Sequence, residues 1–185
     1  MKKILVIMGT VRQNRSSEVV ANWVMKNLPK TENTTYELVD LRDWQLPFFE
    51  EAMPPLASQG VYQLELANKW VAKTKEADGF LIVTAEYNHS VPAVLKNALD
   101  YWYAGFIKQK PVSFISYGAA SGGCRAVEHL RQICSVLQLI TLPTEINIPF
   151  IWEAFAEDGS IKRESTVQHL HGLIAELDQW FGKKV

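Results

Sequence analysis

Short apolar stretches alternate along the chain with longer stretches in which apolar residues recur every three or four positions. Three of the short stretches lack a regular alternation of apolar and polar residues, which is typical of strands buried on both faces of a sheet. A fourth stretch does alternate and resembles an edge strand, and a fifth contains a proline. The expected strands cover residues 4–8, 35–40, 79–83, 111–115 and 141–146.

Apolar residues at helical spacing lie between the expected strands and predict amphipathic helices over residues 16–28, 64–77, 92–103, 125–139 and 164–181. Strands that alternate with helices predict right-handed crossovers and a parallel sheet with helices on both faces. Five strands and five helices fit an α/β fold of the flavodoxin-like type, a three-layer α/β/α sandwich with a five-stranded parallel sheet of order 2-1-3-4-5.

Composition and charge limit the class of protein and the macromolecules that it could bind. A chain of 185 residues, 48% hydrophobic, suits a single α/β domain with a sizeable core. Its formal charge of -1 favours neither nucleic acid nor an anionic membrane. Cys124 and Cys134 lie about 15 Å apart in one expected helix, too far to form a disulfide. The apolar run after Lys3 is too short for a signal peptide or a membrane span. The cytoplasm is therefore the expected location.

The loop after the first strand combines hydroxyl and guanidinium groups directly before a helix. Residues 9–17 read Gly-Thr-Val-Arg-Gln-Asn-Arg-Ser-Ser. Backbone donors, a helix N-terminus and arginine side chains together suit one phosphate group. The loop lacks the glycine patterns of dinucleotide and P-loop sites, so it favours the monophosphate of FMN over the pyrophosphate of FAD. In the alternative interpretation, Ser16 or Ser17 caps the helix and the arginines are solvated.

Two further loops favour a flat heterocycle. After the third strand, Tyr87 offers a stacking surface and the amides near Asn88 offer hydrogen bonds to its edge. After the fourth strand, the small residues of segment 116–123 let the backbone approach a flat ligand closely, although they would also suit a flexible helix entry. His89 is either a surface histidine or a proton donor. Cys124 has no adjacent base or second thiol, which favours packing over reactivity.

Together these three loops resemble those of the NADPH-dependent FMN reductase family, which includes quinone, azo-dye and chromate reductases. The resemblance spans nearly the whole chain and is carried by GTVRQNRSS, AEYNHSVPAVLKNALDYW and SYGAASGGCRA, of which the second is the most specific. The family usually has proline at the position of Ala85, so the backbone there is less rigidly preset in this chain.

The resemblance implies FMN as the cofactor and assigns roles to individual residues. The FMN phosphate would be bound by Thr10, Arg12, Arg15 and Ser17, with Ser16 as a further candidate. The isoalloxazine ring would be lined by Glu86, Tyr87 and Asn88, and its other edge would be covered by Ser116, Gly118, Gly122 and Gly123. Hydride chemistry belongs to the flavin, so neither a catalytic side chain nor a metal is expected.

The same resemblance implies that electrons pass from NADPH or NADH through FMN to a small acceptor, such as a quinone, an azo compound, a metal oxyanion or free flavin. Loops 46–60 and 148–159 are expected to shape the acceptor site. Family members form homodimers or homotetramers, and Trp102, Tyr103 and Phe106 are candidates for such a contact unless they form a buried helix end.

Three other protein classes share this fold or cofactor. A receiver domain needs acidic residues after the first and third strands, where this chain has Met8-Gly9 and Thr84-Ala85. A flavodoxin-type electron carrier docks through a strongly acidic face, which the charge of -1 disfavours. A redox sensor that binds FMN without turnover remains an alternative that activity measurements separate from an enzyme.

Overall fold

Alternate residues of each apolar strand contribute to two different cores, one on each face of the sheet. In the computed structural model, which describes residues 1–29 and 34–182, Leu5 and Ile7 belong to one cluster of buried side chains. The intervening Ile4 and Val6 belong to the other cluster. The absence of alternation in the sequence therefore follows from burial of the sheet on both faces.

The strands form one parallel sheet in the order β2-β1-β3-β4-β5, with β6 also paired to β4. They are β1 (Lys2–Met8), β2 (Thr34–Asp40), β3 (Gly79–Ala85), β4 (Pro111–Tyr117), β5 (Ile140–Thr141) and β6 (Ile146–Ile148). This is the strand order of flavodoxins, and it confirms the predicted fold class.

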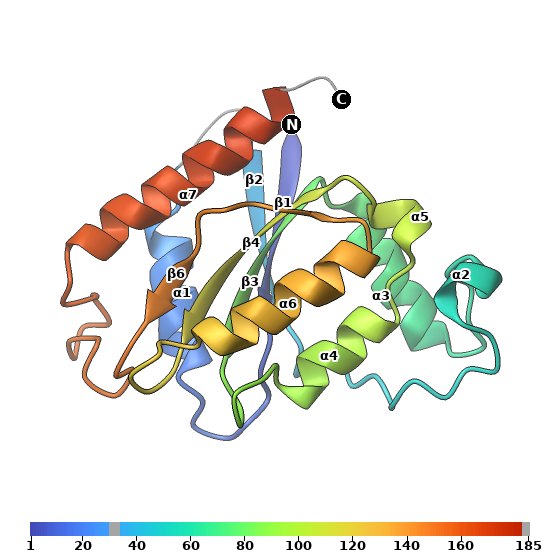
Figure 1. Ribbon diagram of the computed structural model, residues 1–185, viewed down its shortest axis with the longest axis horizontal. Coiled ribbons are helices and arrows are strands. Elements are labelled where there is room, and N and C mark those ends of the chain that lie inside the picture. The colour runs from blue at the N-terminus through green and yellow to red at the C-terminus, as the bar shows by residue number, and fades with distance from the viewer. Residues whose placement is uncertain (30–33, 183–185) are drawn as a thin grey trace.

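Helices cover both faces of the sheet (Figure 1). They are α1 (Ser17–Asn27), α2 (Pro55–Ser58), α3 (Glu65–Glu76), α4 (Ala93–Asp100), α5 (Ala104–Ile107), α6 (Cys124–Val136) and α7 (Ser165–Gly182). Helices α1 and α7 pack on one face, and α3, α4 and α6 pack on the other. No helix in the described ranges is long and apolar enough to cross a membrane.

The fifth strand differs from the prediction, because the single strand expected over residues 141–146 is broken into β5 and β6. Leu142 still donates its N–H to the carbonyl of Val112, at 2.9 Å. Pro143 follows and has no N–H with which to continue the ladder. The chain leaves β4 there, and it pairs with β4 again from Ile146.

Helix α4 ends three residues earlier than its apolar spacing predicted, and the chain enters a buried turn. Trp102 is 1% exposed and packs on Phe80, with ring centroids 4.7 Å apart. Tyr103 and Phe106 are half-buried and contact each other. Of the two interpretations of these aromatic residues, the buried helix end is the correct one for Trp102.

The proline-rich loop 46–60 is irregular except for the single turn of α2, as predicted. The buried side chain of Asn97 in α4 holds the start of this loop. It donates to the carbonyls of Leu46 and Pro47, at 3.2 and 2.8 Å, and accepts from the N–H of Phe49 at 3.0 Å. The loop is therefore attached to α4 through backbone groups, which do not depend on the loop's side chains.

Truncation of a core side chain in the central strand tests this packing. Ile82 in β3 is fully buried, so we expect Ile82→Ala to lower the free energy of unfolding by about 3–4 kcal/mol through lost burial and a residual cavity. Urea denaturation of the cofactor-free protein measures the change. Val61→Ala is the control, because Val61 is 69% exposed and its truncation should change the same quantity by less than about 0.5 kcal/mol. Equal losses would contradict the burial of Ile82.

Candidate functional site

The loops that follow β1, β3 and β4 lie together at one edge of the sheet, at the lower edge of Figure 1. This is a consequence of parallel pairing, because the carboxyl ends of neighbouring strands then meet at the same edge. All twelve residues that the sequence predicted as cofactor contacts belong to these loops, to the last residues of β4 or to the first residue of α1.

The loop after β1 carries backbone donors that the protein does not use. Gly9 donates its N–H to the carbonyl of Val83 at 2.8 Å. Within the described part of the chain, the N–H groups of residues 10–14 form no hydrogen bond, and residues 11–14 are exposed. Helix α1 begins shortly afterwards at Ser17. A run of unpaired amides beside a helix N-terminus is a binding site for an anionic group such as phosphate.

Thr10 and Ser17 join the two ends of this loop by a buried contact between their hydroxyl groups. Both side chains are fully buried, and their hydroxyl oxygens lie 2.6 Å apart. Burial raises the pKa of Tyr117, whose hydroxyl adjoins this pair. Ser16 is the N-cap residue of α1, yet its side chain forms no capping hydrogen bond. The alternative in which Ser16 caps the helix is therefore wrong.

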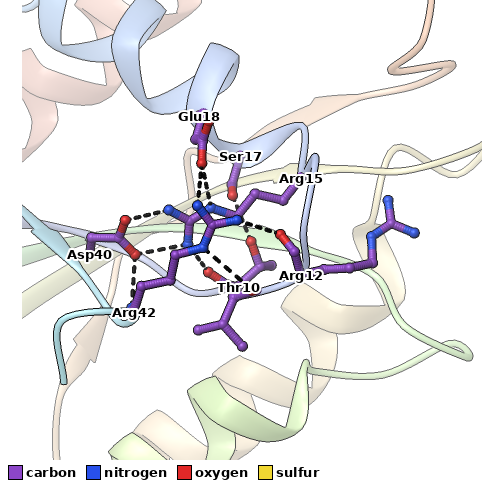
Figure 2. A network of polar contacts seen from close by, with 8 residues as sticks. Thr10, Arg12, Arg15, Ser17, Glu18, Asp40 and Arg42 are labelled. Carbon is purple, nitrogen blue, oxygen red and sulfur yellow. Dashed lines mark hydrogen bonds and ion pairs between the residues drawn. The ribbon is translucent and has the colours of Figure 1, made fainter. Parts of the chain in front are cut away.

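The Arg15 side chain is buried, so it is neither solvated nor exposed for a direct contact with a phosphate. Its side chain is 2% exposed and forms an ion pair with Asp40, the last residue of β2 (Figure 2). The guanidinium contacts both carboxylate oxygens of Asp40 and the carbonyl of Thr10, and its Nε donates to Glu18 at 3.3 Å. Arg15 therefore supports the loop from its protein side.

Arg42 supports the same loop from the segment that follows β2. Its guanidinium donates to the carbonyls of Arg12 and Val11, at 2.6 and 3.4 Å, and to the carboxylate of Glu18 at 2.7 Å. The guanidinium of Arg12 points away from this network (Figure 2) and forms no hydrogen bond or ion pair with any residue that the structure describes. Arg12 is thus the arginine of the loop whose charge is free to meet a ligand.

Asp40, Arg42 and Glu18 were not among the predicted site residues. A signal was present, because Asp40-Leu41-Arg42 places opposite charges at the end of a strand that neighbours β1. Burial raises the pKa of Asp40, but hydrogen bonds from Arg15 and from the N–H of Arg42 outweigh burial, and the pKa lies below its ordinary value. Asp40 is therefore ionised at neutral pH and remains the partner of Arg15.

The loop after β3 forms a tight two-residue turn. Tyr87 and Ser90 exchange backbone hydrogen bonds of 2.9 and 3.0 Å, and the intervening Asn88 and His89 both have positive φ, 50° and 63°. Such a turn is of the type I′ class, which asparagine tolerates well. It exposes Asn88 and His89 at its tip and leaves Tyr87 half-buried beside them. His89 therefore lies at the surface, at the tip of the turn.

The Glu86 side chain joins the loop after β3 to the loop after β4. Its carboxylate accepts hydrogen bonds from the hydroxyl of Ser121 at 3.2 Å, from the N–H of Arg125 at 3.2 Å, and from the Arg125 guanidinium at 3.0 Å. Burial raises the pKa of Glu86, but these bonds outweigh it and leave the pKa below its ordinary value. The carboxylate thus faces the protein, and the backbone of Glu86 is the part left to contact a ring.

Glycines shape the loop after β4. Gly122 and Gly123 have positive φ, 62° and 90°. A Cβ atom at Gly123 would lie 2.8 Å from the Cβ of Ser116, so no other residue fits there without displacement. The Ser116 hydroxyl is buried and lies 2.8 Å from the Gly122 carbonyl, within the protein. Gly118 is half-buried and Ala119 is exposed, so no large side chain covers this part of the loop. Its backbone is held by segment 148–151, because the Gly118 N–H donates to the carbonyl of Ile148 and the N–H groups of Phe150 and Ile151 donate to the carbonyls of Ala119 and Gly118.

Comparison with known proteins agrees with this geometry. The family model described as NADPH-dependent FMN reductase matches residues 2–153. The chain belongs to the NADPH-dependent FMN reductase family. An NAD(P)H-dependent FMN reductase of Schizosaccharomyces pombe is 41% identical over 142 residues, 77% of this chain and 70% of that protein. A 2-hydroxy-1,4-benzoquinone reductase of a Burkholderia species is 29% identical over 186 residues, 96% of this chain and 95% of that protein.

Among solved structures, the flavoenzyme FerB of Paracoccus denitrificans, an NAD(P)H:(acceptor) oxidoreductase, has the same fold. Its TM-score is 0.76 at 23% identity, with 97% of each chain covered. Members of this family are oxidoreductases that use FMN and a reduced nicotinamide, and the donor set found here fits FMN. The free amides of the loop after β1 suit its phosphate, and the loop after β4, which carries no large side chain over Gly118 and Ala119, suits its flat ring.

The cysteines and acidic residues suggest no second chemistry. Cys134 is fully buried, which raises the pKa of its thiol to about 12, and Cys124 is a free cysteine of intermediate exposure at the start of α6. In residues 1–29 and 34–182, no group of three or more His, Cys, Asp or Glu side chains is arranged to hold a metal ion.

The ion pair of Asp40 predicts a defined dependence of stability on pH. Its pKa in the folded protein lies below the ordinary value of 3.8, so the carboxylate stabilises the folded state above that value and loses this effect as the pH falls through the folded pKa. We expect the difference in unfolding free energy between the wild type and Asp40→Asn to be constant above about pH 5 and to shrink below about pH 4. Urea denaturation at a series of pH values measures it. A difference that persists unchanged in acid would contradict the ion pair.

Proposed function

We propose that this chain, as a single domain, binds FMN at the loop edge of its sheet and passes electrons from NADPH or NADH to a small acceptor, namely a quinone, an azo compound, a metal oxyanion or free flavin. The observation that carries the proposal is the run of free N–H groups over residues 10–14, beside the glycine-rich loop after β4. The first suits a phosphate and the second suits a flat ring.

In this proposal the phosphate is held by the backbone of residues 10–14 and by Arg12, with the hydroxyls of Thr10, Ser16 and Ser17 next to it. The isoalloxazine is lined by the backbone of Glu86 and by Tyr87 and Asn88. The segment with Ser116, Gly118, Gly122 and Gly123 covers its other edge. Bound FMN supplies the hydride chemistry, and the protein binds it, orients it and leaves one face open.

Anaerobic titration with NADPH tests the proposal directly. The purified protein is loaded with FMN, and the visible absorbance of the oxidised flavin is followed as NADPH is added. Bleaching followed by reoxidation with a quinone is expected. Bound flavin that NADPH does not bleach would favour an electron carrier or a redox sensor, and failure to bind FMN would overturn the proposal.

Removal of the Arg12 side chain should weaken FMN binding. We expect Arg12→Ala to reduce the free energy of FMN binding by about 1.5–3 kcal/mol, because one charge-assisted hydrogen bond to the phosphate is lost. Quenching of flavin fluorescence measures the dissociation constant. Lys108→Ala is the control, since it removes an exposed positive charge near α5, away from the loop edge. Unchanged affinity of the Arg12 variant would remove Arg12 from the phosphate site.

We further propose that the chain assembles as a homodimer, or as a homotetramer built from such dimers. A hollow of about 420 Å³ between α4, α6 and α2 supports a contact on this face. Its lining is mainly apolar and includes Leu99, Ile133 and Leu137, and at its rim Leu56 and Val136 are 76% and 80% exposed. Large apolar side chains exposed together are typical of protein contacts.

Introduction of charge into this hollow tests the assembly. We expect Val136→Arg to raise the dimer dissociation constant roughly tenfold or more, because a charge would be buried without a partner. Sedimentation equilibrium measures it. Val61→Arg is matched to it, since Val61 is 69% exposed but lies outside the hollow. A monomeric wild type would refute the assembly, and equal effects of the two variants would move the contact to another face.

A cytoplasmic location is the remaining part of the proposal. Reduced nicotinamides are the electron donors of this family, and both cysteines are free thiols, which are typical of reducing compartments. Recovery of the native protein from a secreted or membrane fraction would contradict it.

A further inference from the structure

The guanidinium of Arg15 has almost no capacity left for a ligand. An arginine side chain offers five N–H donors. Four directed contacts are already made: Nε to Glu18, one terminal nitrogen to both the Thr10 carbonyl and Asp40, and the other terminal nitrogen to Asp40. Because the side chain is also 2% exposed, a phosphate outside the loop cannot engage it as a fork.

Arginine donors hold three successive carbonyl groups of the loop. Arg15 binds the carbonyl of Thr10, and Arg42 binds the carbonyls of Val11 and Arg12. Carbonyl oxygens repel an anion, so a loop that binds phosphate through its amides must turn them away. The two arginines do this from the protein side of the loop (Figure 2), and the N–H groups of residues 10–14 are left without a partner among residues 1–29 and 34–182.

Asp40 is the group that holds the side chain of Arg15 and the backbone of Arg42 in place. Its carboxylate accepts from the two terminal nitrogens of Arg15 and from the backbone N–H of Arg42, the latter at 2.9 Å. A buried guanidinium that loses its counter-ion is strongly destabilised, so Arg15 would not keep its position without this carboxylate. The guanidinium of Arg15 reaches its acceptors from three different nitrogens. A lysine has a single nitrogen and cannot occupy these three positions.

We propose that Asp40 is a positioning residue for the cofactor phosphate, and that it acts through the side chain of Arg15 and the backbone of Arg42 to orient the loop amides outward. Arg15 then supports the phosphate loop and is not itself a phosphate ligand. This inference rests on the proposed FMN site, and it adds residues of β2 and of the segment after β2 to a site otherwise built by the loops after β1, β3 and β4.

The two possible roles of Arg15 predict opposite effects of one substitution. If Arg15 were a direct ligand, Asp40 would compete with the phosphate, and Asp40→Asn would tighten FMN binding by releasing a cation and removing a negative charge. If Asp40 positions the loop, the same substitution weakens FMN binding although the site becomes more positive. Riboflavin, which lacks the phosphate, should not respond to a change in the phosphate loop.

The experiment measures dissociation constants of FMN and riboflavin by flavin fluorescence for the wild type and Asp40→Asn. We expect the FMN constant to rise roughly tenfold or more and the riboflavin constant to change by no more than about twofold. Glu65→Gln is the matched control, because Glu65 lies in an exposed ion pair with Lys69 on α3 and its loss changes the net charge equally. Neither constant should change in this control.

Arg42→Lys provides a second variant if Asp40→Asn fails to fold. Lysine retains the charge of the partly exposed Arg42, but its single nitrogen cannot occupy the three positions from which the Arg42 guanidinium reaches Val11, Glu18 and Arg12. We expect roughly threefold weaker FMN binding with unchanged riboflavin binding. Tighter or unaltered FMN binding in whichever variant folds overturns the inference. A wild type that binds FMN no more tightly than riboflavin would instead refute the phosphate site itself.

Discussion

Parallel pairing of β1, β3 and β4 is the constraint on which the rest of the molecule depends. It brings three loops that are far apart in the sequence to one edge, and it requires both faces of the sheet to be covered by helices. The chemistry at that edge is mainly backbone chemistry. Unpaired amides after β1 and bare glycine backbone after β4 create a site whose side chains serve chiefly to hold the main chain in place.

Side chains near the edge fall into two groups by the direction they face. Arg15, Glu86 and Ser116 direct their polar atoms into the protein, where each forms several contacts with loop backbone or with a neighbouring loop. Arg12 and Asn88 are exposed, and the guanidinium of Arg12 points away from the polar network of its loop (Figure 2). A family motif identifies all five residues, but it does not separate residues that build the loops from residues that meet a ligand.

The sequence was sufficient for the fold class and for the edge of the sheet at which the candidate site residues gather, because both follow from local patterns. Strand β3 and helix α6 were recognisable from apolar spacing alone. What local patterns missed were consequences of distant contacts. The ion pair of Arg15 joins residues 25 positions apart, and the burial of Trp102 depends on Phe80 and Trp70 in other elements. The sequence shows Pro143, but the break that it causes between β5 and β6 depends on the pairing register with β4, which the sequence does not show.

Asn97 attaches the start of loop 46–60 to helix α4. One amide side chain contacts three backbone groups between Leu46 and Phe49, so the start of the loop moves as part of α4 rather than as an independent flap. Helix α4 also follows directly from the turn that carries Tyr87 and Asn88. The turn and the start of loop 46–60 are therefore both attached to α4, one ahead of its first residue and the other through the Asn97 side chain.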